Sequence, residues 1–239
     1  MFKSAMCWSF TASAFFALIG FAFAIYLARK KESKFLWIPL GYFALMEALQ
    51  AVTYLYLGSC DASGNQLLTF LSYMHIVFQP IFINAFVLYF IPTKVRSKII
   101  LPVLTLAAIT TVLLIVKIYP FEWAGSCTQG TALCGRALCS YIGNWHLAWS
   151  LPFNNIGGFS IMTYYIIASF ILPLIYGSWK TSLIGILTGP VLAFILTNNP
   201  NEWPAVWCLI SIWIILCAIV TPLRDWLRVE KWYFWDYPK

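Results

Sequence analysis

Long apolar runs recur along the whole sequence and are separated by short polar or charged connections. A helix of roughly twenty apolar residues is long enough to cross the hydrocarbon core of a bilayer. The alternating pattern of membrane strands is absent, so helices must satisfy the backbone hydrogen bonds. We therefore predict an all-α polytopic membrane protein, a single bundle of seven transmembrane helices at about residues 4–28, 35–57, 66–91, 99–119, 156–177, 183–197 and 205–222.

The composition agrees with a membrane-embedded chain. Of the 239 residues, 62% are hydrophobic and only 10% are charged, whereas about 25% of residues are charged in soluble domains. We therefore expect no separate soluble domain. The bundle spans residues 1–223, with a long connection at residues 120–155 and a short tail at residues 224–239.

The basic residues are distributed unevenly over the connections. Of fifteen Lys and Arg residues, twelve follow the first, third, fifth and seventh runs, and only Lys3, Lys117 and Arg136 lie at the other ends. Because Lys and Arg collect on the cytoplasmic side, this pattern predicts an extracytoplasmic N-terminus and an internal C-terminus. The net charge of +7 is thus a topology signal and not a nucleic-acid signal. A bacterial inner membrane and a eukaryotic plasma membrane or endomembrane both fit.

The tail at residues 224–239 mixes four cations with aromatic side chains. The aromatic residues include Trp226, Trp232, Tyr233, Phe234 and Trp235. Such mixtures favour the headgroup zone of a bilayer, so we interpret the tail as an interfacial anchor. A motif that contacts a soluble partner is the alternative.

Polar residues gather within the second and third segments. They include Glu47, Gln50, Tyr54, Tyr73, His75, Gln79 and Asn84. If the two segments are antiparallel, Glu47 and His75 lie at similar depth, roughly 14–17 Å below the same surface. A charged residue inside a membrane span is a functional-site hypothesis by default, and Gln50 and Gln79 lie one turn from the pair. The alternative is a hydrogen-bond network that only holds the helices together.

His146 lies in an aromatic stretch, residues 140–153, whose helix-like spacing is typical of a short interfacial or re-entrant segment. If this segment dips into the bundle, His146 meets Glu47 and His75. Two imidazoles and one carboxylate are a ligand set for catalytic zinc or non-haem iron. The simpler interpretation is a histidine near the headgroups, because no local ligand spacing supports a metal.

Four cysteines fall on the outer side of the predicted topology: Cys60, Cys127, Cys134 and Cys139. An oxidising compartment predicts two disulfides among them, with three connectivities open. A bond from Cys60 to the long connection would tie that connection to the start of the third segment.

Seven helices with an external N-terminus resemble the layout of G-protein-coupled receptors. The third segment ends in Leu88-Tyr89-Phe90-Ile91, without a D-R-Y-type motif, and the seventh has no N-P-x-x-Y motif. The seventh segment also has no lysine for the retinal of microbial rhodopsins, and the late H-x-x-x-H pair of ceramidase-like membrane hydrolases is missing. We assign no family on these motifs.

Three classes of function follow from these residues. The first is a transporter that binds a small solute, proton or cation at Glu47 and His75 in an outward-facing polar cavity. The second is an intramembrane metalloenzyme that acts on a lipid or small apolar substrate through Glu47, His75 and His146. The third is a ligand sensor or receptor. The expected partners are the lipid bilayer and a small molecule or ion, and an oligomer remains open.

Overall fold

The computed structural model describes residues 9–207, 214 and 216–235. Four uninterrupted helices open the fold: α1 (Phe10–Arg29), α2 (Lys34–Tyr54), α3 (Ser63–Leu88) and α4 (Thr93–Ile118). Together with Trp179–Leu196 they make five helices long and apolar enough to cross a membrane in the described part of the chain. This architecture fits an all-α membrane fold.

Two further helices contain π-helical segments. Ile161–Ile175 comprises α5 (Ile161–Ile166), η2 (Ile167–Ile171) and α6 (Leu172–Ile175). Trp179–Leu196 comprises α7 (Trp179–Ile186), η3 (Leu187–Val191) and α8 (Leu192–Leu196). Pro173 follows the first π segment and Pro190 lies inside the second. Since proline has no N–H, it removes a helical hydrogen bond, and the wider register accommodates that loss.

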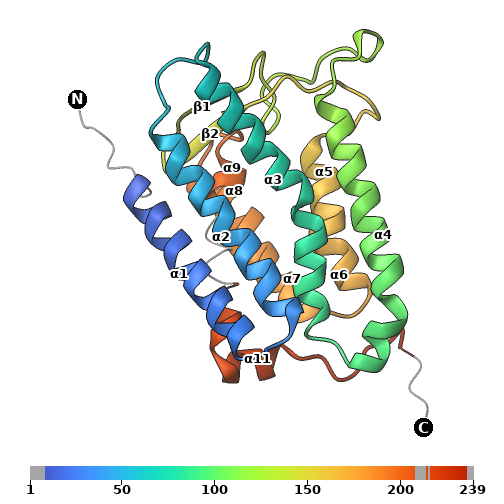
Figure 1. Cartoon of the computed structure of the whole chain (residues 1–239). Coiled ribbons are helices and arrows are strands. Elements are labelled where there is room, and N and C mark those ends of the chain that lie inside the picture. Colours follow the sequence, from blue (N-terminus) through green and yellow to red (C-terminus); the bar gives the residue numbers. More distant parts are fainter. Residues whose placement is uncertain (1–8, 208–213, 215, 236–239) are drawn as a thin grey trace.

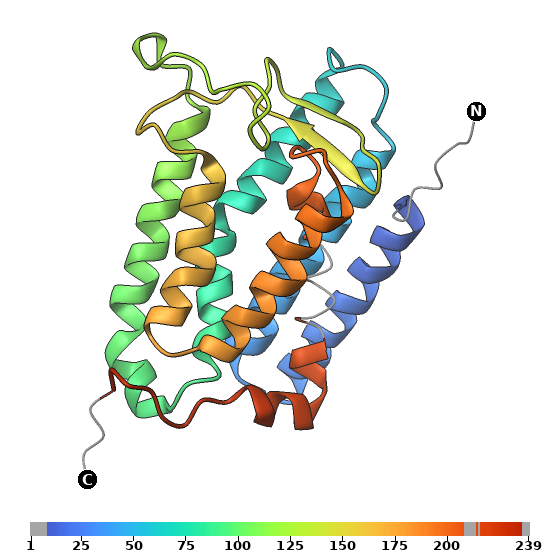
Figure 2. The ribbon, with the colours of Figure 1, turned by 180° about the vertical axis from the view of Figure 1, so that it is seen from behind.

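α2 and α3 form the centre of the bundle, whereas α1 and α4 lie at its opposite edges (Figures 1 and 2). In the apolar window of α3, 61% of the residues are buried, against 22% in α4. Leu18 on α1 and Leu101 on α4 are 71% and 76% exposed. Exposed apolar faces of this extent are typical of helices that contact lipid.

The long connection forms a lid over one end of the bundle, here called the hairpin end (Figure 1). It contains η1 (Glu122–Ala124) and the antiparallel strands β1 (Cys139–Ile142) and β2 (Leu147–Ser150), in which Cys139 pairs with Ser150. The prediction of a helix-like segment at residues 140–153 is therefore wrong. Strand formation depends on cross-strand partners, which local helical spacing does not report.

Two disulfides stabilise this lid, as predicted. Cys60 bonds to Cys139, and Cys127 bonds to Cys134. The first bond joins β1 to the segment just before α3. Of the three possible connectivities, the structure therefore has Cys60–Cys139 with Cys127–Cys134. Next to the first bond, Asn65 on α3 donates to the Ser140 carbonyl and accepts from the Ser140 N–H, both at 2.8 Å. The hairpin is thus fixed to the end of α3.

The opposite end of the bundle is here called the α11 end, after the short helix α11 (Thr221–Leu227) that lies there (Figure 1). The following tail folds back on the bundle, since the indole N–H groups of Trp232 and Trp235 donate to the Ile175 and Tyr176 carbonyls at 3.1 and 2.9 Å. The predicted seventh segment, residues 205–222, includes residues 208–213 and 215, which lie outside the described residues. It overlaps the end of α9 (Trp203–Val206), and residues 216–219 are helical.

The fourth helix begins earlier than predicted. With the fourth segment predicted at residues 99–119, the basic residues Lys94, Arg96 and Lys98 would lie in the connection before it, but they lie in the first turns of α4, which begins at Thr93. Lys and Arg are good helix formers, and Pro92 is the residue that precedes the helix. The helix therefore continues beyond its apolar part into the basic region.

Candidate functional site

One face of α2 carries buried polar side chains from the middle of the bundle to the hairpin end. Glu47 and Gln50 are 1% and 0% exposed. Tyr54 lies about two turns beyond Glu47 on the same side of the helix, and its hydroxyl is 2.9 Å from Nδ1 of His146. The polar face of α2 therefore reaches the hairpin.

His146 points into the protein, although it is on the turn of the hairpin. The side chain is 2% exposed and stacks on Tyr54 with an interplanar angle of 11°. The Leu147 N–H donates to Nδ1 at 2.7 Å, so Nδ1 is an acceptor and the neutral ring carries its hydrogen on Nε2. Burial lowers the pKa of His146 to about 3. The imidazole is therefore neutral at physiological pH.

Glu202 holds the hairpin turn, and sequence reasoning missed it. This fully buried carboxylate accepts the backbone N–H groups of three consecutive residues, Asn144, Trp145 and His146. It also accepts the Thr197 hydroxyl at 2.7 Å. These charge-assisted bonds fix the turn and hence the direction of the His146 ring. The donors in the turn are backbone N–H groups, so the side chains of the turn give no sequence signal for this contact.

His75 is engaged away from Glu47. Its Nε2 donates to the Tyr42 carbonyl at 2.7 Å, and its Nδ1 lies 3.4 Å from Nε2 of Gln79. The Tyr42 ring stacks on the imidazole at a centroid distance of 4.0 Å. No hydrogen bond or ion pair joins the described side chains of Glu47 and His75. The helices bring the two residues into one bundle, but the rotation of α3 directs His75 to Tyr42.

Gln79 and Tyr73 connect α3 to other helices. The Gln79 side-chain oxygen accepts the Tyr165 hydroxyl of α5. The Tyr73 hydroxyl donates to the Leu114 carbonyl of α4 at 2.6 Å. Both residues thus bridge neighbouring helices, and Gln79 extends the polar contact of His75 towards α5.

Asn84 joins α3 to the π-helical segment η2. Its Nδ2 donates to the carbonyls of Pro80 and Ala168 at 2.7 and 2.8 Å, and its Oδ1 accepts the Tyr176 hydroxyl at 3.1 Å. The Ala168 carbonyl is available because Pro173 has no N–H to offer in the π register. This geometry satisfies the Asn84 amide within the protein and supports a role in helix packing.

The donor geometry does not fit the predicted metal set. The described residues contain no group of three or more His, Cys, Asp and Glu side chains that could hold a metal ion. Both ring nitrogens of His75 are hydrogen-bonded within α2 and α3, and Nδ1 of His146 contacts the Tyr54 hydroxyl and the Leu147 N–H. A zinc or iron centre that uses His75 would need its imidazole to leave the Tyr42 carbonyl or Gln79.

The fold and the site define a mostly α-helical protein with five helices long and apolar enough to cross a membrane in its described part, and with a buried polar face closed by a disulfide-bonded hairpin. Residues 11–228 match the model of a family of unknown function (DUF5765), and the chain belongs to that family. No curated protein and no solved structure matches the chain.

Proposed function

We propose that the chain is an integral membrane protein with seven spans that binds a small solute, proton or cation at Glu47 and carries it across the membrane. Five helices have the length and apolarity of membrane spans, Ile161–Ile175 adds a shorter one, and the seventh falls at residues 205–222. The disulfides suit an oxidising compartment, and the cations gather at the α11 end. Both features favour a hairpin end outside the cytoplasm and an α11 end inside.

The burial of Glu47 beside Gln50 carries the proposal. A carboxylate costs about 2.5–3.5 kcal/mol at the centre of a membrane helix on insertion scales, and such residues mark ion and proton pathways. In the proposed mechanism Glu47 takes up the proton or cation, and the Gln50 amide supplies a second polar contact. The contact between Tyr54 and His146 closes the site on the hairpin side.

The test is ion flux into liposomes that contain the purified chain and a pH-sensitive dye. A potassium diffusion potential drives proton uptake. In parallel assays, a sodium or potassium gradient replaces this potential as the driving force. We expect flux in the wild type, a loss of at least tenfold in Glu47→Gln, and retention in Glu47→Asp. The matched control is Glu122→Gln, which removes an exposed carboxylate of the lid. Flux equal to that of empty liposomes, or unchanged in Glu47→Gln, contradicts proton and cation transport through Glu47.

A ligand sensor is the second candidate, and the bond between Cys60 and Cys139 favours it. A covalently fixed lid restricts opening at the hairpin end, which suits binding without passage. The two functions separate in one experiment: a sensor binds its ligand without flux, and removal of residues 224–239 abolishes its signal but leaves binding intact. A transporter without its tail keeps measurable flux.

A further inference from the structure

A cavity of about 310 Å³ opens at the α11 end, between the turn that joins α3 to α4 and the chain that follows α11. Arg96 of α4 and Arg228 of the tail line it from two sides, together with Tyr89 and Thr93. Glu230 lines it as well. Two guanidinium groups against one carboxylate make the cavity cationic.

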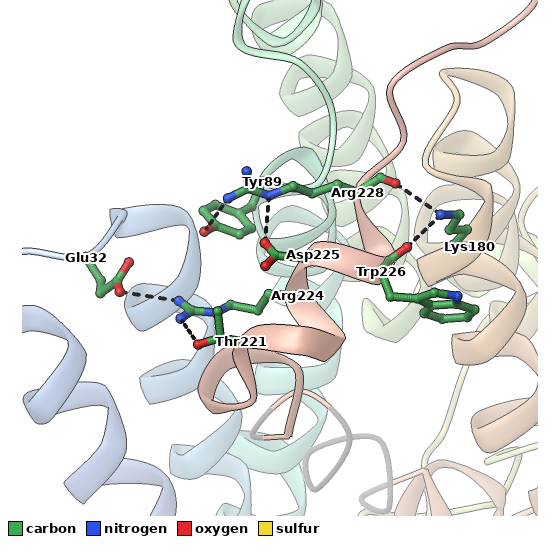
Figure 3. A network of polar contacts seen from close by, with 8 residues as sticks. All are labelled: Glu32, Tyr89, Lys180, Thr221, Arg224, Asp225, Trp226 and Arg228. Carbon is green, nitrogen blue, oxygen red and sulfur yellow. Dashed lines mark hydrogen bonds and ion pairs between the residues drawn. The ribbon is translucent and has the colours of Figure 1, made fainter.

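Backbone contacts build this cavity. The Val229 N–H donates to the Phe90 carbonyl at 2.9 Å, which straps the tail across the end of α3. On the other side, Lys180 of α7 donates to the Trp226 and Arg228 carbonyls at 2.6 and 3.2 Å (Figure 3). The tail is therefore held at both ends of the segment that carries Arg228, and the cavity has defined walls.

The two arginines retain donors for a ligand. The Arg228 side chain is 56% exposed, and its contacts to the Tyr89 hydroxyl and to Asp225 are long, at 3.4 and 3.8 Å (Figure 3). Arg96 lies over the Phe35 ring and bonds Thr93 at 3.4 Å, without an ion pair to any described residue. A guanidinium has five N–H donors, so these few contacts leave several available on each side chain.

Arg224 differs from the two arginines of the cavity because it is paired within the fold. Its guanidinium forms an ion pair with Glu32 at 3.4 Å, its side chain is only 12% exposed, and it also contacts Thr221 (Figure 3). This arginine joins α11 to the connection between α1 and α2, whereas Arg96 and Arg228 face a cavity.

We propose that the cavity binds the phosphate group of an anionic phospholipid. Arginine suits phosphate because its planar fork donates two parallel hydrogen bonds. Basic pockets between helices on the cytoplasmic side bind anionic lipid headgroups. The neighbouring tail exposes Trp226, Tyr233 and Phe234 at 55%, 91% and 72%, and these rings suit the interfacial zone of a bilayer. They favour a lipid over an acidic soluble protein as the occupant.

The experiment titrates the full-length chain in neutral detergent with dioctanoyl phosphatidylglycerol and counts bound lipid by native mass spectrometry. We expect saturable binding of one lipid and about fivefold weaker binding in each of Arg96→Gln and Arg228→Gln, since one such charge contributes about 1 kcal/mol near an anionic surface. The double variant should lose about 25-fold. Arg136→Gln, which removes a cation at the hairpin end, should bind as the wild type does.

Three outcomes overturn the proposal. The first is equal affinity of the double variant and the wild type. The second is equal affinity for phosphatidylcholine with the same acyl chains, which shows that the headgroup charge is irrelevant. The third is competition by inorganic phosphate or glycerol phosphate at the concentration of the lipid, which identifies a soluble-anion site. The Arg228→Gln variant should fold normally because the Arg228 side chain is largely exposed. Its elution volume in gel filtration should match that of the wild type.

Discussion

The two ends of the bundle use charged groups in different ways. At the hairpin end, Glu202 is fully buried and bonded to the backbone, and His146 is 2% exposed. At the α11 end, Arg228 and Asp225 are 56% and 63% exposed and 3.8 Å apart. A buried charge with several short bonds fixes the backbone around it, whereas an exposed charge with long contacts can still bind a ligand. The buried charge of Glu202 thus fixes the hairpin turn, whereas the Arg228 side chain at the α11 end stays accessible.

The largest effect should follow the loss of the bond between Cys60 and Cys139. It closes a loop of 79 residues, for which chain entropy predicts about 4.5 kcal/mol, against about 2.4 kcal/mol for the 7-residue separation of Cys127 and Cys134. We expect the first Cys→Ser pair to lower the melting temperature in detergent more than the second pair. The readout is intrinsic tryptophan fluorescence, and equal losses would show that the lid is held by its other contacts.

Removing the Glu202 carboxylate should be the next largest perturbation. Glu202→Ala leaves three backbone N–H groups of the turn without their acceptor, and each unsatisfied buried donor costs about 1–3 kcal/mol. We expect a loss of about 3 kcal/mol or more, smaller in Glu202→Gln because the amide oxygen can still accept. Thermal unfolding measures both variants.

Glu122→Gln is the matched control for that experiment, since its carboxylate is exposed in the same lid. It should melt as the wild type does. If Glu202→Ala and Glu122→Gln melt alike, the contrast between a rigid hairpin end and an open α11 end fails.

Some features of this architecture could be predicted from sequence and others could not. The helices α1 to α4 were predictable because apolar runs of membrane length report only local composition. The participation of Cys60 in a disulfide followed from topology and compartment. The role of Glu202 could not be predicted, because its partners in the turn are backbone N–H groups that every residue except proline carries.

The partners of the His75 side chain could not be predicted from sequence either. Depth along a helix follows from the rise per residue, so Glu47 and His75 could be placed at a similar level. Which neighbour a side chain meets depends on the rotation and packing of both helices. Here the packing brings the His75 ring into contact with the Tyr42 carbonyl and Gln79. Sequence composition does not contain that information.

A smaller effect should appear in the pH dependence of stability. Burial holds the pKa of folded His146 near 3, below the value of about 6.5 for an unfolded histidine. The unfolded state therefore binds the extra proton between these values, so stability is complete above about pH 6.5 and falls as the pH decreases. We expect a loss of about 2 kcal/mol at pH 5.

His146→Gln isolates this contribution, because the other titrating groups are common to both proteins. The difference in melting temperature between wild type and variant should shrink from pH 7 to pH 5. Parallel curves would mean that the imidazole titrates normally and that the lid admits water to it.

The smallest effect should come from the ion pair between Glu32 and Arg224 at the α11 end. Its partners are 3.4 Å apart, with side-chain exposures of 35% and 12%, and pairs of this kind contribute about 0.2–1 kcal/mol. Because solvent and salt screen the pair, Glu32→Gln should shift the melting temperature slightly, and 0.5 M salt should remove most of that shift. A loss as large as that of Glu202→Ala would mean that α11 is anchored as rigidly as the hairpin. The contrast between the two ends of the bundle would then fail.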